Sequence, residues 1–233
     1  RKPKRKARRI MKTCLIVDTE TTGLDPDESE AIEVGAILYS ITHQTSLASL
    51  SFLCTPVSEN PCEQTNRIPA AATEALPTKL RASSWDLFNA LVDHADVIVA
   101  HNADFDKQWY WDIEKPWLCT MEDFDWSPHD HVNGKSLVAI ALSHGIGVSS
   151  AHRALTDCQL IAELLNRHHD LQTLFRRAMR PKAIFRAVVS YDDNHLAKAA
   201  GFRWNPESKI WWRRMAIEDA AKLSFRTVKI QDC

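Results

Sequence analysis

The sequence predicts an α/β protein in which helices flank a mixed sheet, followed by a small C-terminal α+β domain. Three strand-like segments come first, and alternating helical and strand-like segments follow them. A second set of short elements begins after a basic stretch that contains a proline, RRAMRPK. Consecutive strands followed by alternating helices and strands are typical of one sheet with antiparallel and parallel pairs.

The composition is that of a soluble globular protein. The 233 residues are 45% hydrophobic and 25% charged, which is enough apolar material for a sizeable core. No apolar run approaches the ~20 residues that a membrane-spanning helix needs. Neither GxGxxG nor GxxxxGK[ST] occurs, which argues against a Rossmann dinucleotide site and a P-loop. The six cysteines form no CxxC pair, so we expect reduced thiols and a cytoplasmic location.

Charge divides the chain into parts of opposite sign. Residues 1–12 hold 8 Lys and Arg and no acid, residues 13–181 hold 11 basic and 24 acidic residues, and residues 182–233 hold 10 basic and 6 acidic residues. We interpret 1–12 as a basic flexible arm, most simply a solvated tail, with nucleic-acid binding and targeting as the alternatives. We expect a main domain over 13–170, a linker over 171–181 and a small basic domain over 182–233.

The first half of the main domain reads as strands and one long helix. The run CLIV before Asp18 is apolar, partly β-branched and ended by TTGLDPD, which predicts a buried strand. Residues 31–39 and 46–54 predict two further strands. Residues 84–94 predict a helix with Ser84 as its N-cap, because Trp and Leu recur at helical spacing after it.

The second half alternates between the two element types. DVIVA at 96–100 predicts a fully buried strand, and a helix over 102–111 follows it. A short strand is expected at 117–121, and amphipathic patterns predict helices at 135–143 and 156–168.

The small basic domain is predicted to be a β-α-β-β-α unit. AIFRAVVSY at 183–191 reads as a strand, and DDNHLAKAAG at 192–201 reads as a helix closed by glycine. FRWNPESKIWW at 202–212 predicts a hairpin around a proline-containing turn, and a last helix is expected at 217–223.

Carboxylates follow the strands at three places. Asp18 and Glu20 are two residues apart at the end of the first strand, so their side chains share one face of the sheet. Asp106 lies just past the strand at 96–100, and His152 precedes Asp157 by five residues at the opening of a helix. Strand ends and helix N-termini are where α/β sheets place their ligands.

Such a cluster of acids needs a compensating cation, because neighbouring carboxylates raise one another's pKa. An all-oxygen site suits Mg²⁺ or Mn²⁺ better than Zn²⁺, which prefers His and Cys. Two such ions about 3.5–4 Å apart can hold the attacking and leaving oxygens of a phosphoryl displacement, and a nearby His can accept the proton of the attacking water.

Three motifs resemble those of a known family. VDTETTGLD at 17–25, HNADFD at 101–106 and HRALTD at 152–157 are similar to the exonuclease motifs of the DEDDh-type 3′–5′ exonucleases of the DnaQ-like superfamily, in the family's order. Among family members, AHNADFD, WLCTM and HRALTDC look most like exodeoxyribonuclease X. The resemblance covers about residues 13–169 and implies a ribonuclease H-like mixed sheet.

The resemblance also implies the roles of individual residues. Asp18, Glu20 and Asp157 would hold one divalent metal ion, and Asp18 would bridge to a second ion supported by Asp106. His152 would be the general base. The reaction would release nucleoside 5′-monophosphates from a free 3′ end of a nucleic acid.

Substrate contacts in the main domain follow from the same resemblance. Leu24 matches a position that packs on the terminal base, Asn102 matches one near the substrate, and Thr21 belongs to the same first motif. One region departs from the family: relatives often carry a His-Gly-Ile element where this chain has NRIPAAATEAL at 66–76. Contacts to the penultimate nucleotides of the substrate therefore differ from the family pattern.

Several residues have a structural alternative to a functional role. Asp104 is expected to be a surface acid or helix cap rather than a ligand, and His101 a structural hydrogen-bond partner rather than a catalytic group. His129 and His131 flank Asp130 without a third ligand at metal-binding spacing. Core packing is the expected role of the remaining four, Trp109, Trp111, Trp117 and Cys158.

The C-terminal hairpin combines tryptophans with arginines. Aromatic rings between cationic groups are typical of surfaces that stack on single-stranded bases, so Trp204, Trp212 and Arg213 are expected to bind nucleic acid. The alternative is that the rings fill a small core. Because Trp211 and Trp212 are adjacent in a strand, they must face opposite ways.

The sequence thus predicts a two-metal 3′–5′ exodeoxyribonuclease, with DNA favoured over RNA through the likeness to exodeoxyribonuclease X. The alternatives are a 3′–5′ exoribonuclease and a non-catalytic, nucleic-acid-binding or polymerase-associated subunit. A homodimer and a polymerase or DNA-repair partner are compatible with the family, and no membrane association is expected.

Overall fold

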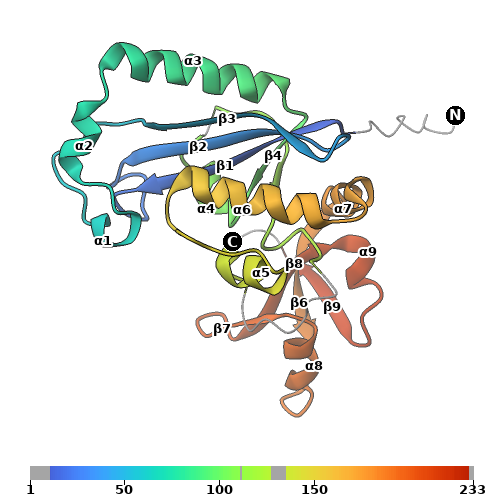
Figure 1. The fold of residues 1–233 in the computed structure, drawn as a ribbon. Coiled ribbons are helices and arrows are strands. Elements are labelled where there is room, and N and C mark those ends of the chain that lie inside the picture. The colour runs from blue at the N-terminus through green and yellow to red at the C-terminus, as the bar shows by residue number, and fades with distance from the viewer. Residues whose placement is uncertain (1–10, 111, 127–134, 231–233) are drawn as a thin grey trace, which may run out of the picture. The chain divides into compact units, whose positions relative to one another are not determined.

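The computed structural model describes residues 11–110, 112–126 and 135–230, which divide into two compact units between Ala178 and Met179 (Figure 1). Each unit has its own sheet and its own hydrophobic core. Most of the expected basic arm lies outside the described residues. No helix in the described part of the chain is long and apolar enough to cross a membrane.

The first unit is built on a five-stranded mixed sheet in the order β3-β2-β1-β4-β5. β1 is central, antiparallel to β2 on one side and parallel to β4 on the other. β3 is antiparallel to β2, and β5 is parallel to β4. The mixed sheet flanked by helices is a ribonuclease H-like fold, as predicted. The strands are β1 (Thr13–Thr21), β2 (Ala31–Ser40), β3 (Thr45–Leu53), β4 (Val97–Ala100) and β5 (Trp117–Cys119).

Helices cover both faces of this sheet (Figure 1). The helices are α1 (Glu63–Asn66), α2 (Ala70–Ala75), α3 (Thr78–His94), α4 (Ala103–Lys107), α5 (Leu137–Ser143), α6 (Ala154–Arg167) and α7 (Leu171–Ala178). α3 packs on the face that carries Leu15 and Val17 of β1, whereas α6 packs on the face that carries Cys14 and Ile16. The period of two along β1 therefore divides its side chains between two cores.

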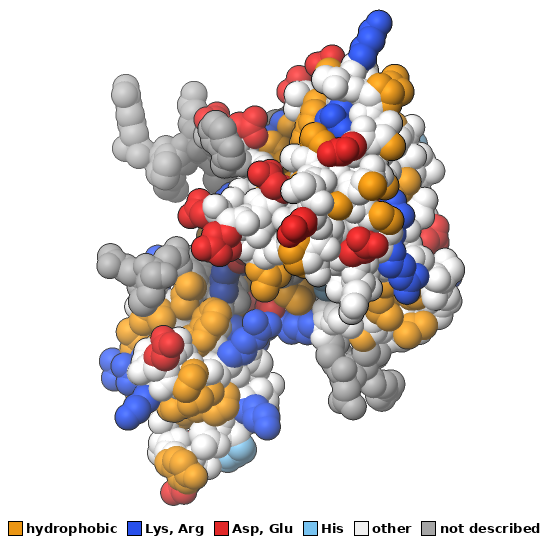
Figure 2. All heavy atoms as spheres, turned by 90° about the vertical axis from the view of Figure 1, so that its left-hand side faces the viewer, with side chains coloured by type: hydrophobic (Ala, Val, Ile, Leu, Met, Phe, Trp, Pro, Cys, Tyr) orange, Lys and Arg blue, Asp and Glu red, His pale blue; other side chains and the backbone are white. Residues whose placement is uncertain are grey.

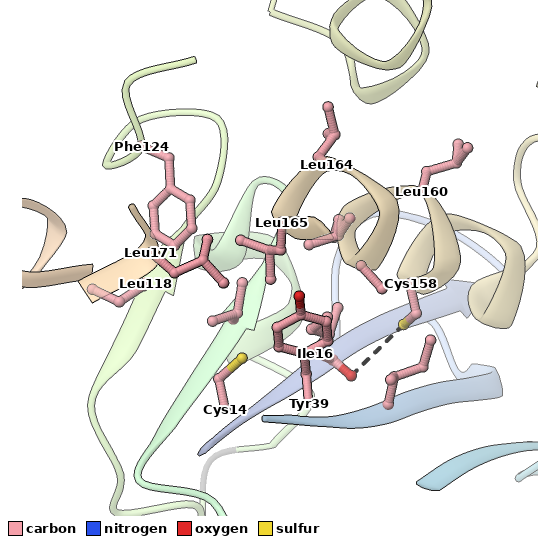
Figure 3. Close-up of a cluster of buried hydrophobic side chains, with 14 of the residues drawn as sticks. Cys14, Ile16, Tyr39, Leu118, Phe124, Cys158, Leu160, Leu164, Leu165 and Leu171 are labelled. Atoms are coloured by element: carbon pink, nitrogen blue, oxygen red, sulfur yellow. Dashed lines mark hydrogen bonds between the residues drawn. The ribbon is translucent and has the colours of Figure 1, made fainter. Parts of the chain in front are cut away.

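The hydrophobic core between α6 and the sheet extends along β1 toward the carboxyl-terminal end of that strand. Figure 3 shows the Cys158 thiol of α6 pointing at the backbone carbonyl of Ile16, with an Sγ–O distance of 3.7 Å. Cys158 is fully buried, which confirms its predicted packing role. Because Cys14, Ile16, Asp18 and Glu20 share one face of the strand, the same helix lies over the carboxylates farther along.

β2 and α6 approach each other closely at Gly35. A Cβ atom at this position would lie 2.3 Å from the backbone carbonyl carbon of Ala154, so only glycine fits without moving the helix. Gly35 pairs with Asp18 across the β1–β2 ladder. The beginning of α6 is thus held against the part of the sheet that carries the first motif.

The second unit is a four-stranded antiparallel sheet in the order β7-β8-β6-β9, with both helices packed on one face. Its core contains Phe185, Ala187 and Met215 from the strands, with Ala197 and Ala220 from the helices. The small C-terminal α+β domain is therefore confirmed. Its elements are β6 (Lys182–Val188), α8 (Asn194–Ala199), β7 (Arg203–Asn205), β8 (Ile210–Ala216), α9 (Ile217–Ala220) and β9 (Arg226–Ile230).

Several predicted boundaries were wrong. α3 begins at Thr78 rather than at Ser84, whose hydroxyl donates to the Leu80 carbonyl within the helix instead of capping it. Pro77 supplies the restricted backbone before the first turn. α4 ends at Lys107, well short of the expected residue 111.

The predicted linker at 171–181 is also different in the structure. Its first eight residues form α7, which buries Leu171, Leu174, Phe175 and Ala178 in the core of the first unit. This i, i+3, i+4, i+7 spacing is the pattern of an amphipathic helix, but the adjacent arginines made the segment look like a solvated connection. In the C-terminal unit, β9 was not predicted, and α9 is shorter than the expected helix.

Candidate active site

Three carboxylates converge where β1 ends under the first turn of α6. Asp18 and Glu20 project from the α6 face of β1, and Asp157 is in the first turn of α6. One carboxylate oxygen from each of the three lies within 4.8 Å of the others. The structure therefore brings together the acids of the first and third motifs, which are more than 130 residues apart in sequence.

Asp106 is buried in α4 and interacts electrostatically with Asp18. It lies outside the group of three whose oxygens approach within 4.8 Å. Thr19 hydrogen-bonds Asp106, and the Thr19 hydroxyl is also 2.8 Å from the Tyr110 hydroxyl. Asp106 is thus fixed from the opposite face of β1, because Thr19 alternates with Asp18 and Glu20 along the strand.

Burial makes these carboxylates poor acids in the absence of a cation. It raises the pKa of Asp18 well above its ordinary value and the pKa values of Glu20 and Asp106 to about 8. It also raises the pKa of Asp157, and the backbone N–H of His152 opposes this shift by hydrogen-bonding the carboxylate. Neighbouring acids add to the effect, most strongly Asp106 on Asp18 and Asp157 on Glu20.

The donor set fits a hard divalent cation. The Oδ1 atoms of Asp106 and Asp157 are buried and have no hydrogen-bond partner among the described residues. A buried carboxylate oxygen without a partner is costly unless a cation or proton satisfies it. Since the cluster offers carboxylate oxygens and neither thiol nor imidazole, its chemistry matches that of Mg²⁺ or Mn²⁺ sites.

His152 directly precedes the segment that leads into α6, in a strained backbone conformation. It is exposed and has a φ of 61°, in the left-handed region that non-glycine residues rarely adopt. Such a residue persists only when its surroundings fix it. Here the contacts of Arg153 and Ala154 with β2, and of its own N–H with Asp157, hold the backbone on the carboxyl-terminal side of His152.

Glu33 of β2 makes those contacts. It is only 2% exposed, and the Arg153 guanidinium donates from Nε to Oε2 at 3.0 Å and from Nη2 to Oε1 at 2.7 Å. The Ala154 N–H at the start of α6 also donates to Oε2, at 3.1 Å. Neither Glu33 nor the pairing of Arg153 with it was predicted from the sequence. A charged residue inside the apolar strand AIEVGAI is the signal that could have found it, because buried acids need partners.

Of the predicted substrate contacts of the first unit, Leu24 and Asn102 are exposed, whereas Thr21 is buried. Leu24 is 82% exposed, and its carbonyl accepts a 3.4 Å hydrogen bond from the Gln108 side chain. The Thr21 hydroxyl donates to the Gly23 carbonyl and so fixes the turn before Leu24. Asn102 is exposed just before α4, with a φ of 67°.

The structure also separates structural residues from candidate ligands. Both ring nitrogens of His101 have partners, the Thr120 hydroxyl and the Lys135 carbonyl, so its predicted structural role is confirmed. Asp104 is exposed in the first turn of α4, as expected for a surface acid. Trp109 and Trp117 pack against the core, as predicted. Trp111, His129, Asp130 and His131 lie outside the described residues.

Residues of the C-terminal hairpin have different environments. Trp204 is 48% exposed, whereas Trp212 is partly buried and pairs with Arg186 and Arg203 on the sheet face opposite the helices. The Arg213 guanidinium donates to the Ala200 carbonyl at the end of α8. Arg213 is therefore engaged in closing that helix, a role that its place in the sequence pattern did not reveal.

The family model described as an exonuclease matches residues 15–165, which include every residue of the acidic cluster. The chain belongs to this exonuclease family. Its three motifs and ribonuclease H-like fold make it a DnaQ-like DEDDh 3′–5′ exonuclease. Residues 183–230 match a second family, described as a domain of unknown function.

Curated relatives include the PolC-type DNA polymerases III of Thermotoga petrophila and Thermotoga maritima. Both are 28% identical over 66% of this chain. The chain spans only 12% of the length of these polymerases.

Solved structures share the fold at low identity. E. coli exonuclease I in complex with a dT13 oligonucleotide covers 92% of this chain and 68% of its own, with a TM-score of 0.58 and 13% identity. The nuclease domain of 3′hExo, a DEDDh family member bound to rAMP, covers 69% of this chain and 93% of its own, with a TM-score of 0.53 and 14% identity. Exonuclease X with 5′ overhanging duplex DNA covers 70% of this chain and 99% of its own, with a TM-score of 0.48 and 22% identity.

Removing the Arg153 side chain should lower the free energy of unfolding more than removing the charge of Glu33 does. Arg153→Ala leaves Glu33 charged and buried beside three other acids, so we expect a loss of roughly 3 kcal/mol in the free energy of unfolding. Glu33→Gln keeps an oxygen for the Ala154 N–H and releases a half-exposed arginine to water, so a smaller loss is expected. Urea unfolding of both variants measures the difference, and equal losses would contradict the asymmetry.

Replacing Asp106 should stabilise the metal-free protein at high pH. Burial raises the pKa of Asp106 to about 8, so folding favours its protonated form and this contribution is lost as pH rises from about 4 to 8. Asp106→Asn has the same shape without the charge. In EDTA at pH 8 we expect its Tm to exceed that of the parent by at least about 2 °C, with the gap closing near pH 4. Thermal unfolding at both pH values tests this, and a lower Tm at pH 8 would contradict it.

Proposed function

We propose that this chain is a divalent-metal-dependent exonuclease that removes nucleoside 5′-monophosphates one at a time from the 3′ end of DNA. The observation that supports it most directly is the partly buried meeting point of Asp18, Glu20 and Asp157, with the buried Asp106 beside it. A protein has little reason to bury several carboxylates with unpartnered oxygens unless a cation joins them.

In this proposal Asp18, Glu20 and Asp157 hold one Mg²⁺ or Mn²⁺ ion, and Asp18 and Asp106 hold a second. Bound ions would supply the positive charge that stabilises the phosphoryl-transfer transition state. The chain's own contribution is to orient these carboxylates, which it does through the rigid strand β1, the first turn of α6 and the hydrogen bond from Thr19.

His152 is the proposed general base. It is exposed, its backbone N–H is hydrogen-bonded to Asp157, and it interacts electrostatically with that carboxylate, which supports a role in accepting the proton of the attacking water. Leu24, with Thr21 fixing its turn, is proposed to pack on the terminal base, and Asn102 to contact the terminal nucleotide. The exposure of Leu24 and Asn102 is consistent with these contacts.

DNA is the proposed substrate because the curated relatives are DNA polymerases and a structural neighbour is titled as a complex with dT13. RNA is the alternative, since another neighbour is titled as a 3′-exonuclease that recognises a histone mRNA stem-loop. Association with a polymerase or with DNA repair, and a homodimer, are further proposals. The free thiols of the described cysteines are consistent with a cytoplasmic location.

Hydrolysis of 5′-labelled single-stranded DNA and RNA of matched sequence tests the activity. With Mg²⁺ we expect a ladder that shortens from the 3′ end, faster on DNA, and no products in EDTA. Asp18→Ala should lower the rate at least about a hundredfold, because the site loses its shared carboxylate. Asp104→Asn is the matched control: it removes an exposed acid of the second motif and should leave the rate within twofold.

No cleavage of either strand with any divalent metal would contradict the proposed function and favour a non-catalytic nucleic-acid-binding subunit. Faster cleavage of RNA would retain the mechanism and reverse the substrate assignment.

Removing residues 179–233 should weaken substrate binding without removing chemistry. The first unit is acidic and the second is basic, so the second is expected to supply much of the attraction to phosphates. We expect KM to rise, kcat to change less than KM, and the dependence of KM on salt concentration to flatten. Steady-state kinetics at several salt concentrations measures this, and an unchanged KM and salt slope would contradict it.

A further inference from the structure

The C-terminal unit contains an open pocket of about 530 Å³ that is formed entirely by its own residues. This volume lies within the range of pockets that take one small-molecule-sized group. The pocket is lined by the end of β6 and the loop after it, the start of α8 and the β7–β8 hairpin. The residues that matter here are Tyr191, Trp204, Lys209 and Trp211.

Aromatic rings form one wall of this pocket. Trp204 and Trp211 are paired across the β7–β8 ladder, and their ring centroids are 5.7 Å apart at an angle of 58°. Trp211 also packs against the core of the unit, and its ring lies next to that of Trp204. Trp204 is 48% exposed and Tyr191 is 89% exposed. Neighbouring large rings that are exposed to solvent are a common mark of a binding site.

Positive charge accompanies the rings. Lys209 lines the pocket and is exposed, and no Asp or Glu is among the described residues that line it. Figure 2 shows Lys and Arg side chains next to hydrophobic ones on the C-terminal unit, whereas Asp and Glu are prominent on the visible face of the larger unit. The pocket thus offers stacking surfaces and a cation together.

We propose that this pocket binds one unpaired nucleotide of a nucleic-acid strand. The base stacks on Trp204 and Tyr191, and a flanking phosphate lies near Lys209. Stacking on aromatic rings with a neighbouring cationic track is how proteins bind single strands independently of sequence. The assignment rests on the proposed function, because a nuclease substrate is the polyanion that the charge of this unit complements.

The proposal replaces part of the surface expected from the sequence. Trp204 is retained, but Trp212 lies on the opposite face of the sheet and Arg213 is engaged with the end of α8. Tyr191 and Lys209 take their places. An acidic peptide would also meet the positive charge, but it offers no planar group to cover the exposed rings at every residue.

Fluorescence anisotropy of a labelled 15-nucleotide single strand tests the site without requiring catalysis. The full-length Asp18→Asn protein is used in EDTA, so the strand stays intact. We expect Trp204→Ala to weaken binding between about fivefold and a hundredfold. Tyr191→Ala, at an almost fully exposed position, should weaken it at least about threefold, and both variants should keep the melting transition of the parent.

A charge-matched pair separates the pocket from general attraction. Lys209→Glu and Lys229→Glu change the net charge equally, but Lys229 is on β9, at the sheet edge opposite β7. We expect Lys209→Glu to weaken binding several times more than Lys229→Glu does. Equal losses from the two, or unchanged affinity in both aromatic variants, would overturn the proposal.

Two further outcomes are decisive. A parent protein that binds no single strand but binds an acidic peptide of equal charge would overturn the proposal in favour of a peptide site. A parent that binds the strand through Trp204 and Tyr191 while the wild-type enzyme hydrolyses nothing would support the pocket and contradict the proposed function, so the two failures are distinguishable.

Discussion

The electrostatic cost of burying carboxylates at the end of β1 is the constraint on which the site depends. Asp18, Glu20 and Asp157 are held close together at partly buried positions beside the buried Asp106, and burial is the largest cause of each raised pKa. The surrounding fold must therefore be rigid enough to resist their repulsion. Central β1 is hydrogen-bonded on both sides and covered by α3 and α6, which provides that rigidity.

The same constraint explains why β2 contacts the start of α6. Gly35 allows the helix to approach the sheet, and Glu33 accepts hydrogen bonds from Arg153 and from the first N–H of the helix. These contacts fix the position of Asp157. They also fix His152, whose backbone N–H is hydrogen-bonded to the Asp157 carboxylate. One short stretch of β2 thus couples the first motif to the third, so the carboxylates on the strand and the histidine on the loop are positioned as a unit.

The sequence predicted the central strands and the ligand candidates because both depend on local signals. β-branched runs marked β1, β2 and β4, and the motif spacing identified the acids. Contacts between distant segments were not predictable in this way. The Glu33–Arg153 pair joins residues 120 positions apart, and Arg213 caps a helix from a neighbouring strand. α7 was not predicted because its arginines made a segment with four core residues look like a solvated connection. β9 was not predicted because it has few apolar side chains among its basic ones.

Calorimetric titration of the metal-free protein with Mn²⁺ at pH 7, in two buffers of different ionisation enthalpy, tests most directly whether the acidic cluster is a cation site. Glu20 and Asp106 have pKa values of about 8 without metal, so binding must displace protons. We predict saturable binding of two ions per chain with net proton release, both lost in Asp18→Asn. No saturable binding, or binding without proton release that Asp18→Asn retains, would contradict the assignment of these carboxylates as metal ligands.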